Sequence, residues 1–264
     1  MTSLYFRLIG ARIRSQMQYK LSFWLDMAGF GLLTWIEFAV TFVLLSRFQS
    51  IGGWGIAEVA LLYGLSSIAY SIAEMAGRGF DRCDTLIQTG NFDVVLTRPL
   101  GSFFQVLCSD FQLRRLGRTF QGAAVLIYAL TSLHIVWTPE RLLVIPVTIA
   151  SGAVIFIAIL MIGAAMCFWT VKTPEIINIF TAGGQQMTCY PQSIFNQWIR
   201  GVFLFVVPVA FASYPAGLLI LGRSDPNGLP AAAAWAAPLA ATLFFLAALG
   251  FWRVGVSKYT STGS

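Results

Sequence analysis

Long apolar runs separated by short polar loops extend along the whole chain. A helix needs about 20 apolar residues to cross a bilayer. A mixed segment over 174–222 holds a further crossing, either 174–191 followed by an external re-entrant hairpin over 192–222, or 201–221 itself. Both alternatives predict an all-α integral membrane protein with six transmembrane helices, a single domain over 1–264, and both termini on one side. The other five runs lie at about 23–46, 56–77, 116–137, 142–170 and 232–253.

The composition excludes an ordinary soluble domain. Of the 264 residues, 57% are hydrophobic and only 11% are charged, whereas soluble domains carry about 25% charged residues. The net charge of +6 could suggest nucleic acid, but the arginines lie beside apolar runs, so membrane topology explains them and no nucleic-acid partner is expected. The four cysteines form no CxxC pair, so neither a disulfide framework nor a metal site is predicted.

Arginine and lysine are divided unequally between the two sides of the predicted membrane. With 201–221 as the fifth span, fourteen lie on the side of the termini and three on the other; placing Arg200 outside makes the split thirteen to four. Because loops rich in Lys and Arg stay in the cytoplasm, both termini are predicted to be cytoplasmic. Residues 1–22 mix apolar and basic positions and suggest an interfacial helix on that side, or an ordinary basic flank. The fourteen are Arg7, Arg12, Arg14, Lys20, Arg78, Arg82, Arg98, Arg114, Arg115, Arg118, Lys172, Arg200, Arg253 and Lys258, and the three are Arg47, Arg141 and Arg223.

The stretch over 78–115 is the one substantial polar loop, and it lies on the predicted cytoplasmic side. Gly90 can end one short helix, and Asn91 or Asp93 can cap the next. Pro99 breaks the chain again. The loop is therefore expected to form short helices across the membrane surface, with a solvated connector as the alternative.

Two blocks of sequence stand out, in the loop over 78–115 and in the mixed segment over 174–222. The first is Ile87-x-x-Gly90-x-Phe92-Asp93-x-x-Leu96-x-Arg98-Pro99-Leu100; the second comprises Tyr190-Pro191, Ser193-Ile194-Phe195, Trp198-Ile199-Arg200, Val207-Pro208-Val209-Ala210-Phe211 and Tyr214-Pro215-Ala216. Both blocks resemble the permeases of ABC-2 type exporters, in the bacterial branch that has two different permeases and a separate ATPase. The resemblance extends over nearly the whole chain and says little about cargo.

The resemblance implies a transport subunit of the bacterial cytoplasmic membrane. A coupling helix in the loop after the second span would dock in a groove of a cytoplasmic ATPase dimer, which would hold ATP and magnesium; this chain would carry no cofactor. A second, non-identical permease would complete the pathway, although a homodimer stays open. The resemblance also implies a re-entrant external hairpin after the fifth span, which favours 174–191 as that span. The residues expected to couple to the ATPase are Gly90, Phe92, Asp93, Leu96, Arg98 and Pro99.

The coupling loop also has the local chemistry that docking requires. Phe92, Val94, Val95 and Leu96 could form an apolar docking face, with Asp93 and Arg98 setting its orientation. We expect such a helix to pass motion to the second and third spans, which the loop joins.

Polar stripes inside the predicted spans need a partner or a function, because an intramembrane charge costs roughly 2.5–3.5 kcal/mol on insertion scales. They predict either a translocation pathway or hydrogen bonds between helices. For Glu37, contact with cargo and contact with the partner permease both stay open, and a hydrophobic or cationic amphiphilic cargo, as in multidrug efflux, would fit the first. The stripes are Asp26 and Glu37 on the first span, Tyr63, Ser67, Tyr70 and Glu74 on the second, and Asn178, Thr181, Gln185, Thr188 and Gln192 on the fifth. The candidate pathway residues among them are Glu37, Asp26, Tyr70, Asn178, Thr181, Gln185 and Thr188.

Motifs for chemistry on this chain are missing. No GxxxxGK[ST] occurs, so no P-loop is present, and no HExxH occurs. The one histidine, His134, lies at the edge of a predicted span, where an intramembrane serine protease could not use it. The sequence predicts a transporter subunit and not an enzyme. The alternative is a six-span membrane protein that binds a ligand or partner without ATP-driven transport.

Overall fold

The computed structural model describes residues 10, 13–15, 17–48, 50–170 and 179–260. Over these residues the chain is helical, and its only β pairing is an isolated bridge between Ile51 and Trp54. The predicted interfacial helix over 1–22 lies largely outside the described residues. The longest helices are α2 (Lys20–Phe48), α3 (Ile56–Gly77), α7 (Leu116–Ser132), α8 (Pro139–Met166) and α13 (Ala237–Ser257).

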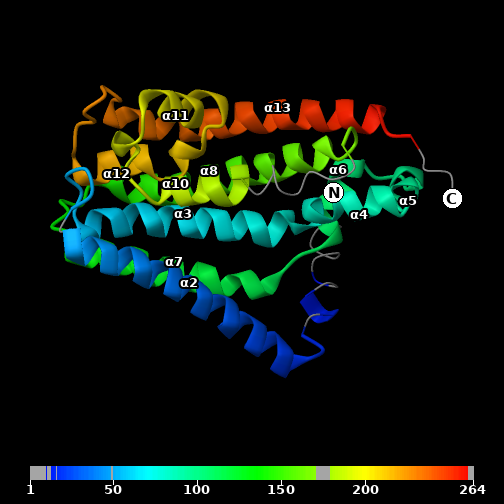
Figure 1. The fold of residues 1–264 in the computed structure, drawn as a ribbon, viewed down its shortest axis with the longest axis horizontal. Coiled ribbons are helices and arrows are strands. Elements are labelled where there is room, and N and C mark those ends of the chain that lie inside the picture. The colour runs from blue at the N-terminus through cyan, green and yellow to red at the C-terminus, as the bar shows by residue number, and fades with distance from the viewer. Residues whose placement is uncertain (1–9, 11–12, 16, 49, 171–178, 261–264) are drawn as a thin grey trace.

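These five helices lie side by side in the order α2, α7, α3, α8, α13 (Figure 1). Glycines allow the central helices to approach closely. A Cβ on Gly64 of α3 would lie 2.9 Å from Cα of Leu126 on α7, and one on Gly122 of α7 would lie 3.2 Å from Cβ of Ser67. As a result α3 is buried over most of its length, whereas α2 contacts mainly α7 and exposes a broad apolar surface.

Four helical stretches of the described chain are long and apolar enough to cross a membrane: Lys20–Val40, Ile56–Gln88, Pro139–Met166 and Ala231–Ser257. They match the first, second, fourth and sixth predicted spans. The third predicted span corresponds to α7, which at 17 residues is shorter than those four. The prediction of an all-helical membrane protein is therefore confirmed.

The helix ends follow from local sequence. The N-terminal turn of α3 is closed by Glu58, whose Oε2 accepts from the Gly55 N–H at 2.8 Å. Thr138 caps α8, and Pro139 occupies its first position, where a missing N–H costs nothing. α12 (Tyr214–Leu221) ends at Gly222, whose φ of 66° allows the left-handed turn that closes the helix.

The segment over 201–221 is not one continuous helix. It consists of the end of α11 (Gln197–Gly201), the π-helical turn η5 (Val202–Val206), the 3-10 turn η6 (Val209–Ala212) and α12. The breaks fall at Pro208 and at Ser213, just before Pro215, because proline cannot donate to a helical ladder. The other candidate for the fifth span is described only over η3 (Ile179–Gly183) and α10 (Gly184–Thr188), since 171–178 lie outside the described residues.

Candidate functional site

The loop over 78–115 folds into short helices at one end of the bundle. They are η1 (Arg78–Arg82), α4 (Cys83–Gln88), α5 (Phe92–Thr97), α6 (Ser102–Ser109) and η2 (Leu113–Arg115). The start of α2 and the end of α13 lie at the same end (Figure 1). The loop contains short helices, as predicted, and their position across the membrane surface stays a prediction.

α6 packs closely against η1, the turn that follows α3. A Cβ on Gly79 would lie only 1.9 Å from the carbonyl oxygen of Val106, so this position requires glycine. The Gln112 N–H donates to the Met75 carbonyl at 3.2 Å, which ties the chain after α6 to α3. These contacts hold α6 against the end of the bundle. We call α4, α5 and α6 together the cap.

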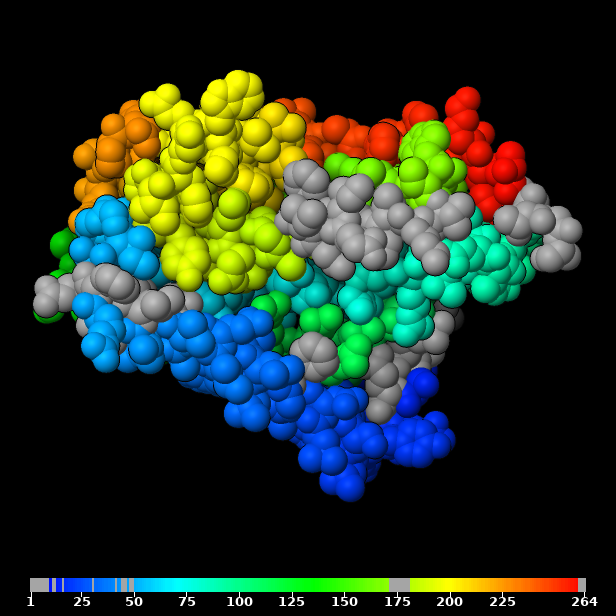
Figure 2. Space-filling model, in the orientation of Figure 1, coloured from blue at the N-terminus to red at the C-terminus, as the bar shows by residue number. Residues whose placement is uncertain are grey.

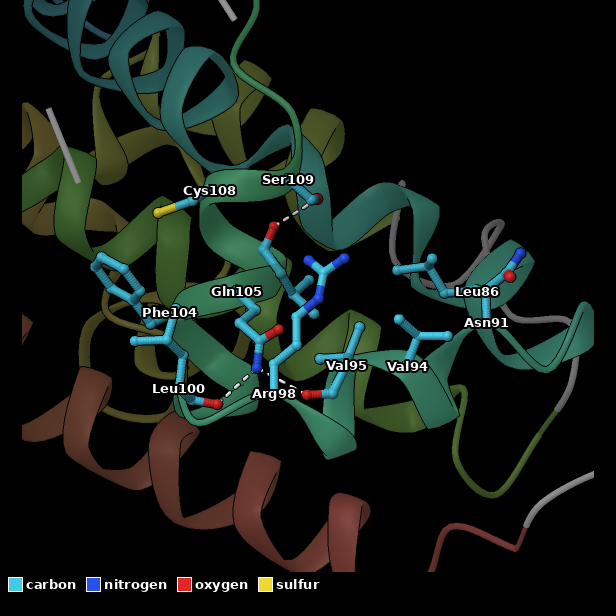
Figure 3. Close-up of a pocket in the computed structure, with 11 residues that line it drawn as sticks. Leu86, Asn91, Val94, Val95, Arg98, Leu100, Phe104, Gln105, Cys108 and Ser109 are labelled. Atoms are coloured by element: carbon cyan, nitrogen blue, oxygen red, sulfur yellow. Dashed lines mark hydrogen bonds between the residues drawn. The ribbon is translucent and has the colours of Figure 1, made fainter. Parts of the chain in front are cut away.

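A groove of about 420 Å³ runs between α4, α5 and α6 (Figure 3). The amide of Gln105 spans its floor and donates to the carbonyls of Val95 at 2.7 Å and Leu100 at 2.6 Å. The Arg98 side chain extends along the groove from the turn between α5 and α6. An apolar groove that carries one long cation is suited to bind a protein segment with a carboxylate.

Phe92 does not belong to an exposed docking face, which corrects the sequence-based prediction. The side chain of Phe92 is 0% exposed, and Phe92 is the only buried residue of α5. The ring contacts those of Phe168, Trp252 and Tyr259, with centroid distances of 5.1, 6.5 and 5.0 Å. Burial of a large ring against three others outweighs any benefit of presenting it to solvent. Phe92 thus joins α5 to the ends of α8 and α13.

The other residues predicted for coupling are arranged around this anchor. Gly90 has a φ of 70° and separates α4 from α5, as expected. Asn91 occupies the N-cap position of α5, but its side chain accepts no capping hydrogen bond, and its Nδ2 donates to Thr89 Oγ1. Asp93 lies beside Tyr259, whose pKa is raised by burial and by this carboxylate. Leu96 is exposed, and Arg98 and Pro99 end the helix as expected.

α2, α3 and α7 meet at a cluster of four charged side chains. Glu74 of α3 pairs with Arg115 at 2.9 Å and with Arg118 at 3.6 Å. Arg118 also binds Glu37 of α2 at 2.9 Å and lies over the ring of Tyr70, 5.2 Å from its centroid. Glu74 is buried, whereas the side chain of Glu37 remains 56% exposed. Arg118 therefore links α2 to the core of the bundle.

Sequence reasoning missed the two arginines, because it counted them only as topology signals. Arg118 lies inside the predicted third span, where an unpaired cation would be costly. That cost was the available signal that Arg118 must face a carboxylate.

The polar residues of α10 face another side of α3. Thr188 meets the hydroxyl of Ser66, and its carbonyl accepts from Ser213 at 2.5 Å. Gln185 is buried and donates to Cys189 Sγ at 3.2 Å, and Thr181 is buried as well. The hydroxyl of α3 that Thr188 meets belongs to Ser66, which is not part of the predicted stripe over Tyr63, Ser67, Tyr70 and Glu74. Asn178 lies outside the described residues.

Asp26 lies away from the charged cluster. It is exposed near the start of α2 and lines a groove of about 360 Å³ together with Arg82, Asp110 and Arg114. Asp26 and Glu37 consequently have different surroundings, although they belong to one helix.

A second ion-pair centre lies at the opposite end of the molecule. Asp225, in the loop over 222–230, pairs with Arg200 of α11 and accepts from Tyr214 Oη at 2.6 Å and from the Leu229 N–H at 2.9 Å. Burial alone would raise the pKa of Asp225, but these hydrogen bonds together lower it, so the carboxylate stays ionised. Arg200 therefore lies at the end of the molecule opposite α4–α6. This position corresponds to the division of Arg and Lys residues into thirteen and four.

The comparisons with known proteins agree with this arrangement. A family model described as ABC-2 family transporter protein matches residues 32–263. No curated protein and no solved structure matches the chain. The match covers α2 from residue 32 onward, the other four long helices, the short helices over 78–115 and the broken segment after α10. This chain belongs to the ABC-2 family of membrane transporter proteins.

Proposed function

We propose that this chain is the transmembrane subunit of an ATP-driven exporter, coupled to a cytoplasmic ATPase dimer through α4–α6. The observation that supports this proposal is that α5 has one exposed apolar side and one buried side. Val94 and Leu96 are about half exposed on its outer side, while Phe92 is buried on its inner side. A force applied to the outer side would therefore reach α8 and α13 through the rings around Phe92, as well as α3 and α7, which the loop joins.

The proposed topology has six spans, with the fifth ending in α10 and a re-entrant segment of α11, η5, η6 and α12. The breaks in 201–221 support this choice, because irregular backbone is tolerated at membrane depth only where protein or water satisfies it. The charge division supports cytoplasmic termini in a bacterial inner membrane. A second permease would cover exposed apolar surface of this chain, and the cargo would be a hydrophobic or cationic amphiphile.

Cysteine accessibility tests this topology. All four native cysteines are buried, so the background should be low. In intact cells, Thr89→Cys should be shielded from an impermeant thiol reagent, whereas Ser50→Cys and Ser224→Cys should react. These three positions are exposed in the fold, and permeabilised cells serve as the control in which all three react. Labelling of Thr89→Cys in intact cells would invert the topology and remove the coupling proposal.

Docking of the ATPase is tested on the outer side of α5. A Val94→Asp, Leu96→Asp double variant places two charges in the proposed interface, so the ATPase recovered with the purified permease should fall at least about tenfold. The fold should persist, because both side chains are already half exposed.

The matched control is Val136→Asp, which changes an exposed valine at the opposite end of the molecule. It should retain the ATPase at the wild-type level. Equal ATPase recovery with the double variant and the control would show that α5 is not the docking surface.

A further inference from the structure

A groove of about 740 Å³ lies between α11, η5 and the loop over 222–230. These segments lie beside one another at the end of the molecule opposite α4–α6, as the adjacent yellow and orange surfaces in Figure 2 show. All of its lining residues are within the described chain, and one of them is Arg200, which pairs with Asp225.

One nitrogen of the Arg200 guanidinium makes a hydrogen bond within the described residues, and another does not. Arg200 is only 6% exposed, and its Nη2 pairs with Asp225. Its Nη1 is buried and donates to no group among the described residues. A buried donor without an acceptor costs about 1–3 kcal/mol, and more when it is charged. Such a donor beside a groove favours a ligand that brings an acceptor oxygen.

Charge narrows the choice of ligand. Asp225 lies against Arg200 and is held ionised by Tyr214 and Leu229, so the groove near Arg200 has donors but little net positive charge. Such a site suits a group with one negative charge shared between oxygens, as in a phosphodiester, better than a free dianion.

The groove has both apolar and polar walls. Leu204, Phe205, Leu229 and Pro230 form the apolar part, in which Phe205 is 83% exposed, and Gln197 and Asn227 are polar. Trp198, on the same segment but outside the groove, is 82% exposed. An exposed tryptophan is typical of the boundary between the hydrocarbon and the headgroups of a membrane, and an exposed phenylalanine nearby is suited to contact with acyl chains.

We propose that this groove binds a phospholipid, with the headgroup phosphate on Arg200 and an acyl chain along Phe205 and Leu204. The size of the groove is adequate for a headgroup and the first part of a chain. The proposed topology would place this lipid in the outer leaflet. The binding of the lipid to the groove does not depend on that topology.

Native mass spectrometry of the full chain, titrated in detergent with a short-chain phosphatidylcholine, tests the proposal. Phe205→Ser removes the exposed wall, and Arg200→Lys keeps the charge beside Asp225 but removes the Nη1 donor. Each should weaken binding at least about tenfold. Diacylglycerol of the same chain length, which lacks the phosphate, should also bind at least about tenfold more weakly to the wild type.

Two control variants match these changes outside the groove. Trp198→Ser removes an equally exposed aromatic ring, and Arg223→Lys alters an arginine that pairs with Glu58 at the same end. Both should bind phosphatidylcholine as the wild type does, and Phe205→Ser keeps the test valid if Arg200→Lys does not fold.

Three outcomes would overturn the proposal. They are equal binding by all variants, displacement of the lipid by inorganic phosphate at the lipid's own affinity, and a dimer of this chain that Phe205→Ser abolishes in place of a lipid adduct. The assay contains neither ATPase nor cargo, so its failure would leave the transport function intact, and a failure of ATPase docking would leave the lipid site intact.

Discussion

Replacing Phe92 with alanine is expected to free α5 from the bundle. Truncating a buried phenylalanine costs about 3–5 kcal/mol, and Phe92 is the only buried residue of this six-residue helix. Amide hydrogen exchange over 92–97 should therefore accelerate by about a hundredfold or more. The acceleration cannot exceed the protection that these amides have in the wild-type protein. In the assembled complex, the ATPase should still bind to Val94 and Leu96, but the permease should no longer alter the rate of ATP hydrolysis.

Two variants separate this effect from a general loss of stability. Phe92→Leu keeps most of the apolar volume and should change the exchange far less. Phe120→Ala makes the same chemical change on α7, where the ring is mostly exposed, and should leave α5 protected. Normal protection of 92–97 in Phe92→Ala would show that the ring cluster does not anchor α5.

Two helix boundaries in the loop over 78–115 could be read from the sequence, because each depends on one local residue. Gly90 adopts a positive φ that other residues rarely adopt, and Pro99 ends α5. The direction of Phe92 could not be read in this way. Four apolar residues lie within a helix of six, and the rings that bury Phe92 come from the ends of α8 and α13, far along the chain.

The sequence indicated that a charge within a span needs a partner, but it did not indicate which residue that partner would be. An acid inside a span needs a partner, and the sequence left open cargo or the second permease for Glu37; the structure adds a partner within the chain, Arg118. Its partner Arg118 is 81 residues away, and the packing of α2 on α7 decides which arginine it meets. In the stripe on α3, Tyr63, Tyr70 and Glu74 contact residues of α7 or of the turn before it, whereas the neighbouring Ser66 meets Thr188 of α10.

Glu74→Gln is expected to be the most damaging single change in the charged cluster. It would leave Arg115 and Arg118 largely buried without their shared carboxylate. Removing one partner of a buried ion pair costs about 3–5 kcal/mol, because the remaining charge has lost its solvent and its counter-ion. The midpoint of thermal unfolding in detergent should fall clearly. Glu37→Gln should be milder, since Glu37 is 56% exposed and Arg118 would keep Glu74.

A double-mutant cycle distinguishes pairing from simple burial of Glu74. Combining Glu74→Gln with Arg115→Gln removes both charges of the closest pair and leaves Arg118 with Glu37, so part of the lost stability should return. Glu58→Gln is the matched control, because it breaks the pair with Arg223, a residue that is less buried. Additive losses in the cycle, or a loss in Glu74→Gln no larger than in Glu58→Gln, would show that the pairing does not hold α2, α3 and α7 together. Recovery in the double variant would instead show that these charges fix the position of α7 against α3, next to the cap on which the ATPase is proposed to act.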